Sequence, residues 1–337
     1  MKMALRLLSR KRNGPQTRQQ RRTAKHTAAQ APPYESAEPL TFEQDLLRRD
    51  LQLERYGIIV ANRNRWKTHP DGETIYRSAL QAIDERFALV PEGFVSLPQT
   101  VIDAPGCPEV DVETQPFLLS RYNVTNRQYQ KFVDDDSYAN LELWDEDTWP
   151  HLIDFKDPTG YPAPRFWQNG RHNQPLADHP VVGICSYEAL AYARWAGFRL
   201  PTEAEWQMAA SWRVRTAAHV LRRYPWGDAL DTQRCNIWAS NIGTTVPVDA
   251  YESGQAPNGV YQLIGNVWEW TSSEFNVTDD EGNRVVGDML MKAIRGGAFD
   301  TYFSAQATSL FRTGLASLAR CHNIGFRCVL DLGDRSQ

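Results

Sequence analysis

The spacing of apolar residues divides the chain into two parts with different expected structure. The stretches FEQDLLRRDLQLERYG (42–57) and TIYRSALQAIDERFALV (74–90) carry apolar residues at helical spacing, with charged residues between them. They predict two amphipathic helices within a region that spans residues 39–90. Near residue 91 the pattern changes, because VPEGFVSLPQTVID alternates apolar and polar positions between turn residues, as β-strands do.

Three further helices are predicted in the rest of the chain. QPFLLSRYNVTNRQYQKFVDD indicates a strand, a turn and a helix, in which Thr125 is the N-cap and Gln128 completes a capping box. SYEALAYARWAG is amphipathic, and Gly197 suits the end of its helix. LPTEAEWQMAASW repeats the capping pattern with Thr202 and Glu205. Beyond it, Gly, Pro, Asn and Trp dominate, which predicts short strands and long loops.

The composition is that of an ordinary soluble globular protein. The chain has 337 residues, of which 42% are hydrophobic and 23% charged, enough for one large or two small domains. Ten of the eleven Trp residues follow residue 140, which predicts a compact, turn-rich C-terminal domain. No apolar run is long enough to span a bilayer, so an integral membrane protein is not expected. A net charge of −4 argues against bulk binding of nucleic acid.

The first 38 residues predict a disordered basic tail. Residues 1–26 contain nine Lys and Arg residues, and no acidic residue precedes Glu35. Such a tail either contacts an acidic partner, a membrane or nucleic acid, or is simply solvated, and the solvated tail is favoured. MALRLL is too short for a secretory leader, so a cytoplasmic location is expected.

Cysteine and histidine give no strong metal signature. The cysteines are odd in number and form no CxxC pair, which favours buried reduced thiols, although a pair between Cys321 and Cys328 stays open. His172 and His179 lie in RHNQPLADHP, where a metal pair is the alternative to polar loop histidines. The cysteines are Cys107, Cys185, Cys235, Cys321 and Cys328.

Four ordered segments carry a family resemblance. They are PFLLSRYNVTNRQYQKFV, PVVGICSYEALAYARWAGFRLPTEAEWQMAA, YPWGD with NIW, and NGVYQLIGNVWEWTSS followed by RGGAF and NIGFRC. Together they resemble the formylglycine-generating-enzyme (sulfatase-modifying-factor) family over residues 91–332. The resemblance implies an α+β, C-type-lectin-like fold of the formylglycine-generating-enzyme type, rich in loops, with a short helical N-terminal extension.

The resemblance implies calcium near GNVWEW. By position, the carbonyl groups of Gly265 and Val267 and the carboxylate of Glu269 would be the ligands, and calcium prefers such hard oxygens. The alternative is a structural ion pair between Glu269 and an Arg. A second family calcium site would begin at Asn236 and the carbonyl group of Ile237, but the distal Asp is not evident in ASNIGTTVPVDAY.

The copper chemistry of the family is not expected here. The resemblance implies an oxidase that holds copper between two Cys thiolates shortly after the RGG motif, and copper(I) prefers such soft sulfur ligands. The first position falls on Thr301 and the second between Ser304 and Gln306, and neither is Cys. Iron-dependent relatives, the sulfoxide synthases of thiol-histidine biosynthesis, use three His residues on an N-terminal bundle with an HxxxHxE pattern. The chain has neither the bundle length nor the pattern.

A third branch uses the same domain as a binding scaffold. The variable proteins of diversity-generating retroelements carry a last segment that begins RGGSW and ends near RNNNIGFR, and copying errors scatter its Asn codons. Apart from Gln306, the stretch from Ala298 to His322 consists of residue types that such errors produce. A non-catalytic family member that has drifted is the alternative.

We therefore expect a non-catalytic protein that binds a protein or other macromolecular ligand through a variable surface over residues 298–322. The alternative is a divergent, metal-dependent, O₂-using oxidase that modifies a protein or peptide. Large aromatic groups in a segment without helical or strand period would anchor a partner if displayed, whereas burial is the alternative for Phe311 and Phe326. The predicted ligand-binding residues are Phe299, Asp300, Thr301, Tyr302, Phe303, Ser304, Thr308, Thr313, Leu315, Ser317 and His322.

Overall fold

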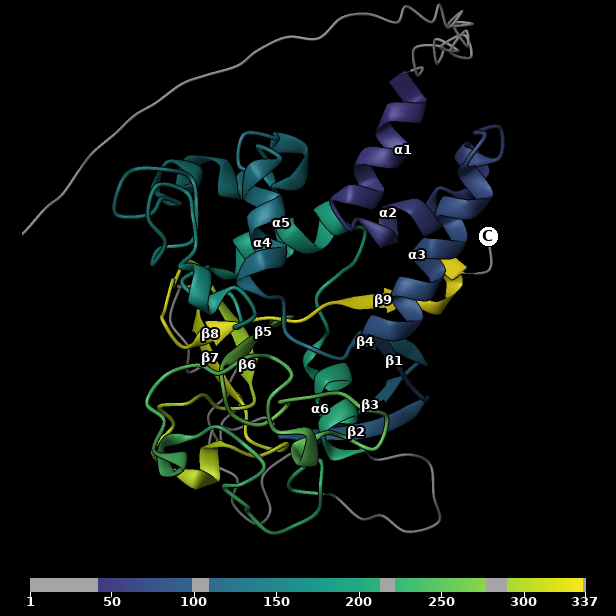
Figure 1. Ribbon diagram of the computed structural model, residues 1–337. Coiled ribbons are helices and arrows are strands. Elements are labelled where there is room, and N and C mark those ends of the chain that lie inside the picture. Colours follow the sequence, from purple (N-terminus) through teal and green to yellow (C-terminus); the bar gives the residue numbers. More distant parts are fainter. Residues whose placement is uncertain (1–41, 99–108, 213–221, 277–289, 336–337) are drawn as a thin grey trace, which may run out of the picture. The chain divides into compact units, whose positions relative to one another are not determined.

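The computed structural model describes residues 42–98, 109–212, 222–276 and 290–335 (Figure 1). The predicted basic tail, Cys107 and the end of the predicted strand region at 99–103 lie outside these residues. Among the described residues, no helix has both the length and the apolar character needed to cross a membrane.

The N-terminal region folds into three helices where the sequence predicted two. The helices are α1 (Phe42–Gln52), α2 (Tyr56–Ala61) and α3 (Gly72–Arg86), with a short 3₁₀ helix, η1 (Arg63–Trp66), before α3. The first predicted helix is interrupted at Glu54, which has a φ of 62° in the left-handed region that helices of L-residues do not use. Leu47, Ile59 and Ile83 are buried in the same apolar cluster as residues of the following domain, so these helices share its core.

The strands form three small sheets. One is antiparallel in the order β1-β4-β9, the second is the β2-β3 hairpin, and the third has the order β7-β6-β5-β8, with β5 and β8 parallel. The yellow β9 lies beside the blue β4 in Figure 1, although the two are far apart in sequence. The strands are β1 (Phe87–Val90), β2 (Gly93–Pro98), β3 (Glu109–Thr114), β4 (Phe117–Ser120), β5 (Trp268–Glu274), β6 (Met291–Arg295), β7 (Thr313–Ala316), β8 (Ile324–Gly325) and β9 (Val329–Asp331).

The three predicted helices of the domain are confirmed. Thr125 and Gln128 form the predicted capping box of α4 (Asn126–Asp134), and Thr202 and Glu205 form that of α6 (Glu203–Ser211). Gly197 ends α5 (Ser186–Ala196) with a φ of 77°. The remaining 3₁₀ helices are η2 (Leu141–Leu143), η3 (Glu146–Asp154), η4 (Gln174–Leu176), η5 (Trp238–Ser240), η6 (Glu252–Gly254), η7 (Ser304–Gln306) and η8 (Leu332–Arg335).

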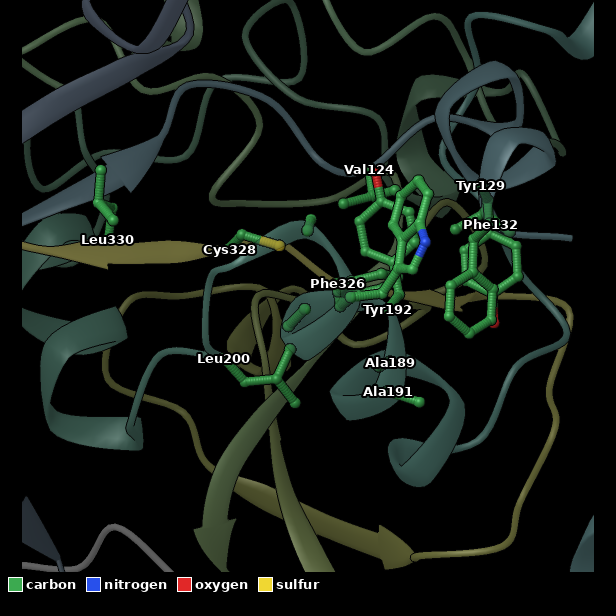
Figure 2. Close-up of a cluster of buried hydrophobic side chains, with 14 of the residues drawn as sticks. Val124, Tyr129, Phe132, Ala189, Ala191, Tyr192, Leu200, Phe326, Cys328 and Leu330 are labelled. Atoms are coloured by element: carbon green, nitrogen blue, oxygen red, sulfur yellow. The ribbon is translucent and has the colours of Figure 1, made fainter. Parts of the chain in front are cut away.

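An aromatic cluster forms the centre of the core (Figure 2). Tyr129 of α4 stacks on Tyr192 of α5 with ring centroids 5.3 Å apart, and Phe326 meets Tyr192 edge-on at 5.4 Å. Such offset and edge-to-face pairs add to the free energy gained from apolar burial. Phe326 is fully buried, as the alternative for this residue anticipated.

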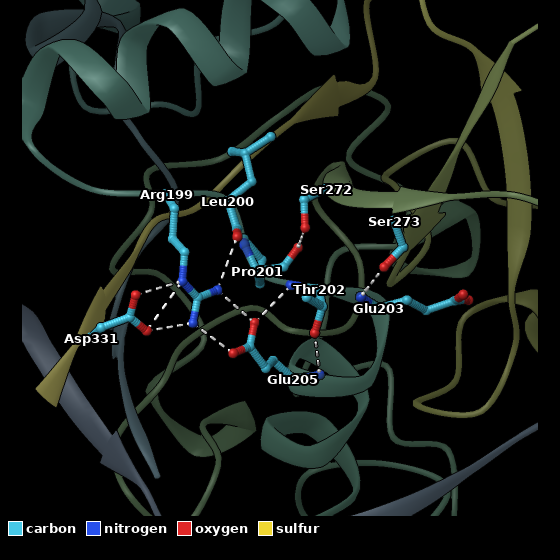
Figure 3. A network of polar contacts seen from close by, with 9 residues as sticks. All are labelled: Arg199, Leu200, Pro201, Thr202, Glu203, Glu205, Ser272, Ser273 and Asp331. Carbon is cyan, nitrogen blue, oxygen red and sulfur yellow. Dashed lines mark hydrogen bonds and ion pairs between the residues drawn. The ribbon is translucent and has the colours of Figure 1, made fainter. Parts of the chain in front are cut away.

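A charged network fastens α6 to the C-terminal strand (Figure 3). The guanidinium of Arg199 donates to both Glu205 and Asp331, at 2.7 Å each. The other carboxylate oxygen of Glu205 accepts from the backbone N–H of Thr202 at 2.8 Å, so the same side chain caps the helix and joins the network. The beginning of α6 is thereby fixed beside β5, where Glu203 N donates to Ser273 Oγ at 2.9 Å.

Candidate functional site

Buried arginines fix the segment that follows β6 to the rest of the domain. Gly296 and Gly297 turn the chain with φ values of 98° and 78°, a conformation that favours glycine. Arg295, just before this turn, pairs with Glu203 at 2.8 Å, and Arg312 pairs with the same carboxylate at 2.8 Å. All three side chains are buried. Because a buried charge is costly without a partner, these pairs constrain the segment between residues 295 and 312.

The end of the segment is held in the same way. Arg320 donates to Glu188 of α5 at 3.0 Å and to three backbone carbonyl groups. Arg327 forms a fully buried, two-bond ion pair with Glu269 of β5, at 2.6 and 2.7 Å. Arg312 and Arg320 lie inside the stretch expected to vary, so that stretch contains fixed structural positions.

The carboxylate of Glu269 is surrounded by protein hydrogen-bond donors. One carboxylate oxygen accepts from Asn123 Nδ2 at 2.9 Å and from Arg327, and the other accepts from Trp206 Nε1 at 2.8 Å and from Arg327. Four donors thus occupy the lone pairs of this carboxylate. The carbonyl group of Gly265 accepts from Val267 N at 2.9 Å. The contacts of Glu269 are those of a structural ion pair, the alternative that the sequence offered. Calcium at Gly265, Val267 and Glu269 stays a prediction.

The residues of the second calcium prediction fit a hard cation only in part. Asn236 Nδ2 donates to the carbonyl group of Thr244 at 2.9 Å, while Asn236 Oδ1 is buried and has no hydrogen-bond partner among the described residues. The carbonyl group of Ile237 accepts from Ser240 N at 2.9 Å. No group of three or more His, Cys, Asp and Glu side chains gathers within the described ranges. Calcium at Asn236 and Ile237 stays a prediction.

The two positions at which the resemblance places copper ligands carry residues with structural roles. Thr301 is buried, and its Oγ1 accepts from Ala298 N at 2.8 Å, closing the turn after Gly297. Ser304 to Gln306 form η7. The described cysteines are all free thiols, so Cys321 and Cys328 do not form the disulfide that the sequence left open. Burial raises the pKa of the Cys328 thiol, which disfavours the thiolate that binds metals.

The two loop histidines contact different partners. His172 Nδ1 lies 3.1 Å from Gln130 Oε1, and His179 Nδ1 lies 2.9 Å from Thr245 Oγ1. Burial lowers the pKa of both rings. Each side chain therefore has its own hydrogen bond, as expected of polar loop histidines.

Several residues predicted to contact a ligand are buried instead. Phe299, Thr301, Thr308 and Ser317 have little or no exposed surface. Thr308 Oγ1 accepts from Phe311 N at 3.1 Å, and Ser317 Oγ donates to the carbonyl group of Leu290 at 2.9 Å. The prediction of display was wrong for these four, because their side chains serve local turns and packing.

The other predicted residues are half-buried or exposed. Tyr302 and Phe303 are 69% and 64% exposed, which is high for large aromatic groups, and Ser304 and His322 are exposed as well. The half-buried residues are Asp300, which lies 3.2 Å from His322 Nε2, and Thr313 and Leu315 of β7.

Two residues that sequence reasoning did not select extend this exposed surface. The ring of Trp238 lies 6.0 Å from that of Tyr302, and the ring of Phe166 lies 6.5 Å from that of His322. Trp238 N also donates to the carbonyl group of Thr301 at 3.4 Å. Both come from loops in distant parts of the sequence, where no period marks them. We call Phe166, Trp238, Tyr302, Phe303 and His322 the aromatic patch.

The fold and this site define a loop-rich, C-type-lectin-like domain with a short helical N-terminal region. Residues 75–332 match the family of sulfatase-modifying factor enzyme 1-like domains. The chain belongs to this family.

Named relatives include enzymes. The chain is 39% identical over 173 residues to the hercynine oxygenase of Mycobacterium tuberculosis, which is 48% of this chain and 39% of that protein. The chain thus spans about two-fifths of the length of this relative. It is 31% identical over 266 residues to the formylglycine-generating enzyme of Thermomonospora curvata, or 65% of this chain and 84% of that protein.

A solved structure shares the fold. The Treponema denticola variable protein 1 superimposes with a TM-score of 0.51 at 15% identity, over 73% of this chain and 94% of that one. At this identity the likeness concerns the arrangement of the backbone alone.

Proposed function

We propose that this chain is a non-catalytic binding protein that contacts a protein ligand through the aromatic patch. The observation that carries the proposal is the exposure of Tyr302 and Phe303 directly after Thr301, where the family resemblance places a copper ligand. Leaving large aromatic rings in water is unfavourable, and contiguous rings of this kind mark binding surfaces. Aromatic residues are also the side chains that most often dominate the free energy of protein association.

The surroundings of the patch support binding by a rigid platform. Phe299 lies 5.8 Å from His322 beneath the surface, and Asn323 Nδ2 donates to Asp300 at 3.0 Å. The buried pairs Arg312–Glu203 and Arg320–Glu188 fix the ends of the same segment. A preformed surface loses less conformational entropy on binding than a mobile loop does.

Burial separates the positions that tolerate the proposed sequence variation from those that do not. If a retroelement varies this segment, variation is compatible with the exposed positions Tyr302, Phe303, Ser304 and His322, and not with the buried arginines. Inspection of the DNA beside the gene tests this point. A near-copy of the segment that differs only at adenines, next to a reverse transcriptase gene, would support diversification, and no such copy would leave a binding protein with a fixed surface.

A comparison of matched variants tests binding itself. The double variant Tyr302→Ser with Phe303→Ser is compared with Ile153→Ser, which removes a side chain of similar exposure, 68%, outside the patch. Both are used with the wild type as bait in lysate of the source organism, followed by quantitative mass spectrometry. We expect one protein to be retained by the wild type and by Ile153→Ser and lost from the double variant. Equal retention on all three would contradict the proposal.

The second candidate is a divergent oxidase, which the enzyme names of the relatives favour. It predicts stoichiometric copper or iron in the purified protein and oxidation of a CxPxR-type peptide to formylglycine. Copper content and peptide mass decide between the two functions. Product formation with bound metal would replace the binding proposal.

A further inference from the structure

A cavity of about 210 Å³ lies where the N-terminal helices meet the lectin-like core. Its walls come from the α1–α2 connection, the end of α3, β1, the segment after β4, and helices α4 and α5. It shares no residue with the aromatic patch. The lining residues are Leu53, Glu54, Tyr56, Arg86, Phe87, Ser120, Tyr122, Asn123, Val124, Thr125, Gln128, Lys131, Tyr192, Phe198, Val248 and Cys328.

Aromatic rings form much of the cavity wall. Tyr56, Tyr122 and Tyr192 line it together with Phe87 and Phe198, whose ring centroids are 4.9 Å apart. Figure 2 shows Tyr192, Val124 and Cys328 in the aromatic core that adjoins this space. A concave, mostly apolar wall with a few polar groups is the usual form of a small-molecule site. Flat rings on several sides favour a flat, apolar ligand body.

Three charged side chains lie together on the cavity wall. The carboxylate of Glu54 is hydrogen-bonded by Arg86 and lies 2.8 Å from Lys131 Nζ. Burial raises the pKa of Glu54, but the hydrogen bonds from Arg86 and Lys131 outweigh this effect, so its pKa lies below the usual value. Glu54 is therefore ionised at neutral pH, and one carboxylate faces two cations. The excess positive charge favours an anionic group on the ligand.

Backbone strain accompanies this charge arrangement. Glu54 is a non-glycine residue at a φ of 62°, which places its carboxylate between side chains of α3 and α4. Residues in such sparsely populated conformations concentrate at binding sites, where the surrounding structure maintains them. The left-handed backbone at Glu54 thus sets the position of its carboxylate between Arg86 and Lys131 on the cavity wall.

The geometry points to a binding site for a small aromatic carboxylate. The rings of the cavity hold the aromatic body, and Lys131 and Arg86 attract the carboxylate. A cationic ligand would meet two like charges at the same wall. This site is independent of the proposed contact surface, so either proposal can fail alone.

Ligand-observed NMR titration of the full chain tests the site with two probes. 4-Hydroxyphenylacetate supplies the ring and the carboxylate, and 4-hydroxyphenylacetamide replaces the carboxylate by a neutral group. We expect saturable binding of the acid and about tenfold weaker binding of the amide, as for loss of a hydrogen bond to a charged group. Lys131→Gln should weaken binding of the acid about tenfold and leave the affinity for the amide unchanged.

The matched control is Arg127→Gln, on the same helix. Arg127 forms an exposed ion pair with Asp178 and does not line the cavity, so this change should leave the affinity for both probes unaltered. Val248→Phe introduces a larger side chain into the lining and should abolish binding of both. If that variant fails to fold, the comparison of Lys131→Gln with Arg127→Gln still tests whether the acid binds at this cavity. No saturable binding of the acid, or equal effects of the two charge changes, would overturn the proposal.

Discussion

Arg327 and Glu269 form a two-bond ion pair in which neither side chain has any exposed surface. The pair connects the residue before Cys328 to the beginning of β5, so the last part of the domain is anchored to the sheet that contains β5. Trp206 and Asn123 complete the coordination of the carboxylate. This one carboxylate therefore joins four segments of the chain.

Glu269→Gln should lower the free energy of unfolding by about 3–5 kcal/mol, because the change leaves a buried guanidinium without its counter-charge. Urea unfolding followed by tryptophan fluorescence measures the loss. The control is Asp178→Asn, which breaks the exposed pair with Arg127 and should cost about 1 kcal/mol or less. Similar losses for the two variants would contradict the structural role of Glu269.

Replacements within residues 298–322 should separate into two classes. Arg312→Ala removes a buried partner of Glu203 and should destabilise by about 3–5 kcal/mol. Tyr302→Ala and Phe303→Ala change exposed side chains and should alter the free energy of unfolding by about 0.5 kcal/mol at most. A display library covering the segment, sorted for folded protein, measures both classes at once. Free replacement of Arg312 in the sorted pool would refute the division.

Gly57→Ala should destabilise the protein although alanine is the better helix former. A Cβ at this position would lie 2.1 Å from the carbonyl oxygen of Gly197, so α2 could not approach the end of α5. Overpacking of this kind costs about 1–3 kcal/mol, whereas helix propensity alone predicts a gain of about 1 kcal/mol. The direction of the change in the thermal unfolding temperature shows which of the two effects is larger. Gly333→Ala, where an added methyl group meets no atom within 4 Å, is the control.

The contribution of Glu54 should depend on pH. Its pKa in the folded protein lies below the usual value of 4.5, since the hydrogen bonds from Arg86 and Lys131 outweigh the effect of burial. The ionised carboxylate therefore stabilises the fold above pH 4.5, and this stabilisation is lost as the pH falls through the folded-state pKa. Glu54→Gln should be less stable than the wild type by about 1 kcal/mol at neutral pH. Urea titrations at several pH values should show the difference shrinking in acid, and a constant difference would contradict the assignment.

Local signals predicted the helices well. Thr125, Thr202 and Gly197 mark helix ends as their side chains and backbone preferences dictate, because capping involves residues only a few positions apart. The break at Glu54 was missed, since Glu carries no preference for a left-handed conformation and tertiary contacts impose it.

The burial of charged side chains around the candidate site depends on partners that are distant in the sequence. Arg312 pairs with Glu203 and Arg320 with Glu188, each more than one hundred residues away, so nothing in the adjacent sequence shows that these arginines are internal. For the same reason the adjacent sequence did not show which Arg pairs with Glu269, because Arg327 is 58 positions later. The aromatic patch depends equally on distant contacts, because Phe166 and Trp238 reach it from separate loops.

The pairing of β9 with β4 also shapes how the protein is made. The sheet that contains β1 and β4 gains its third strand only when residues 329–331 have left the ribosome, about two hundred residues after β4. Until then, Leu118 and Leu119 pair with β1 but lack β9 on their other side, and the carboxylate of Glu269 lacks Arg327. Contacts between residues so distant in sequence form slowly. The nascent chain therefore exposes an unpaired edge of β4 until β9 has been made, and such an edge is prone to aggregation.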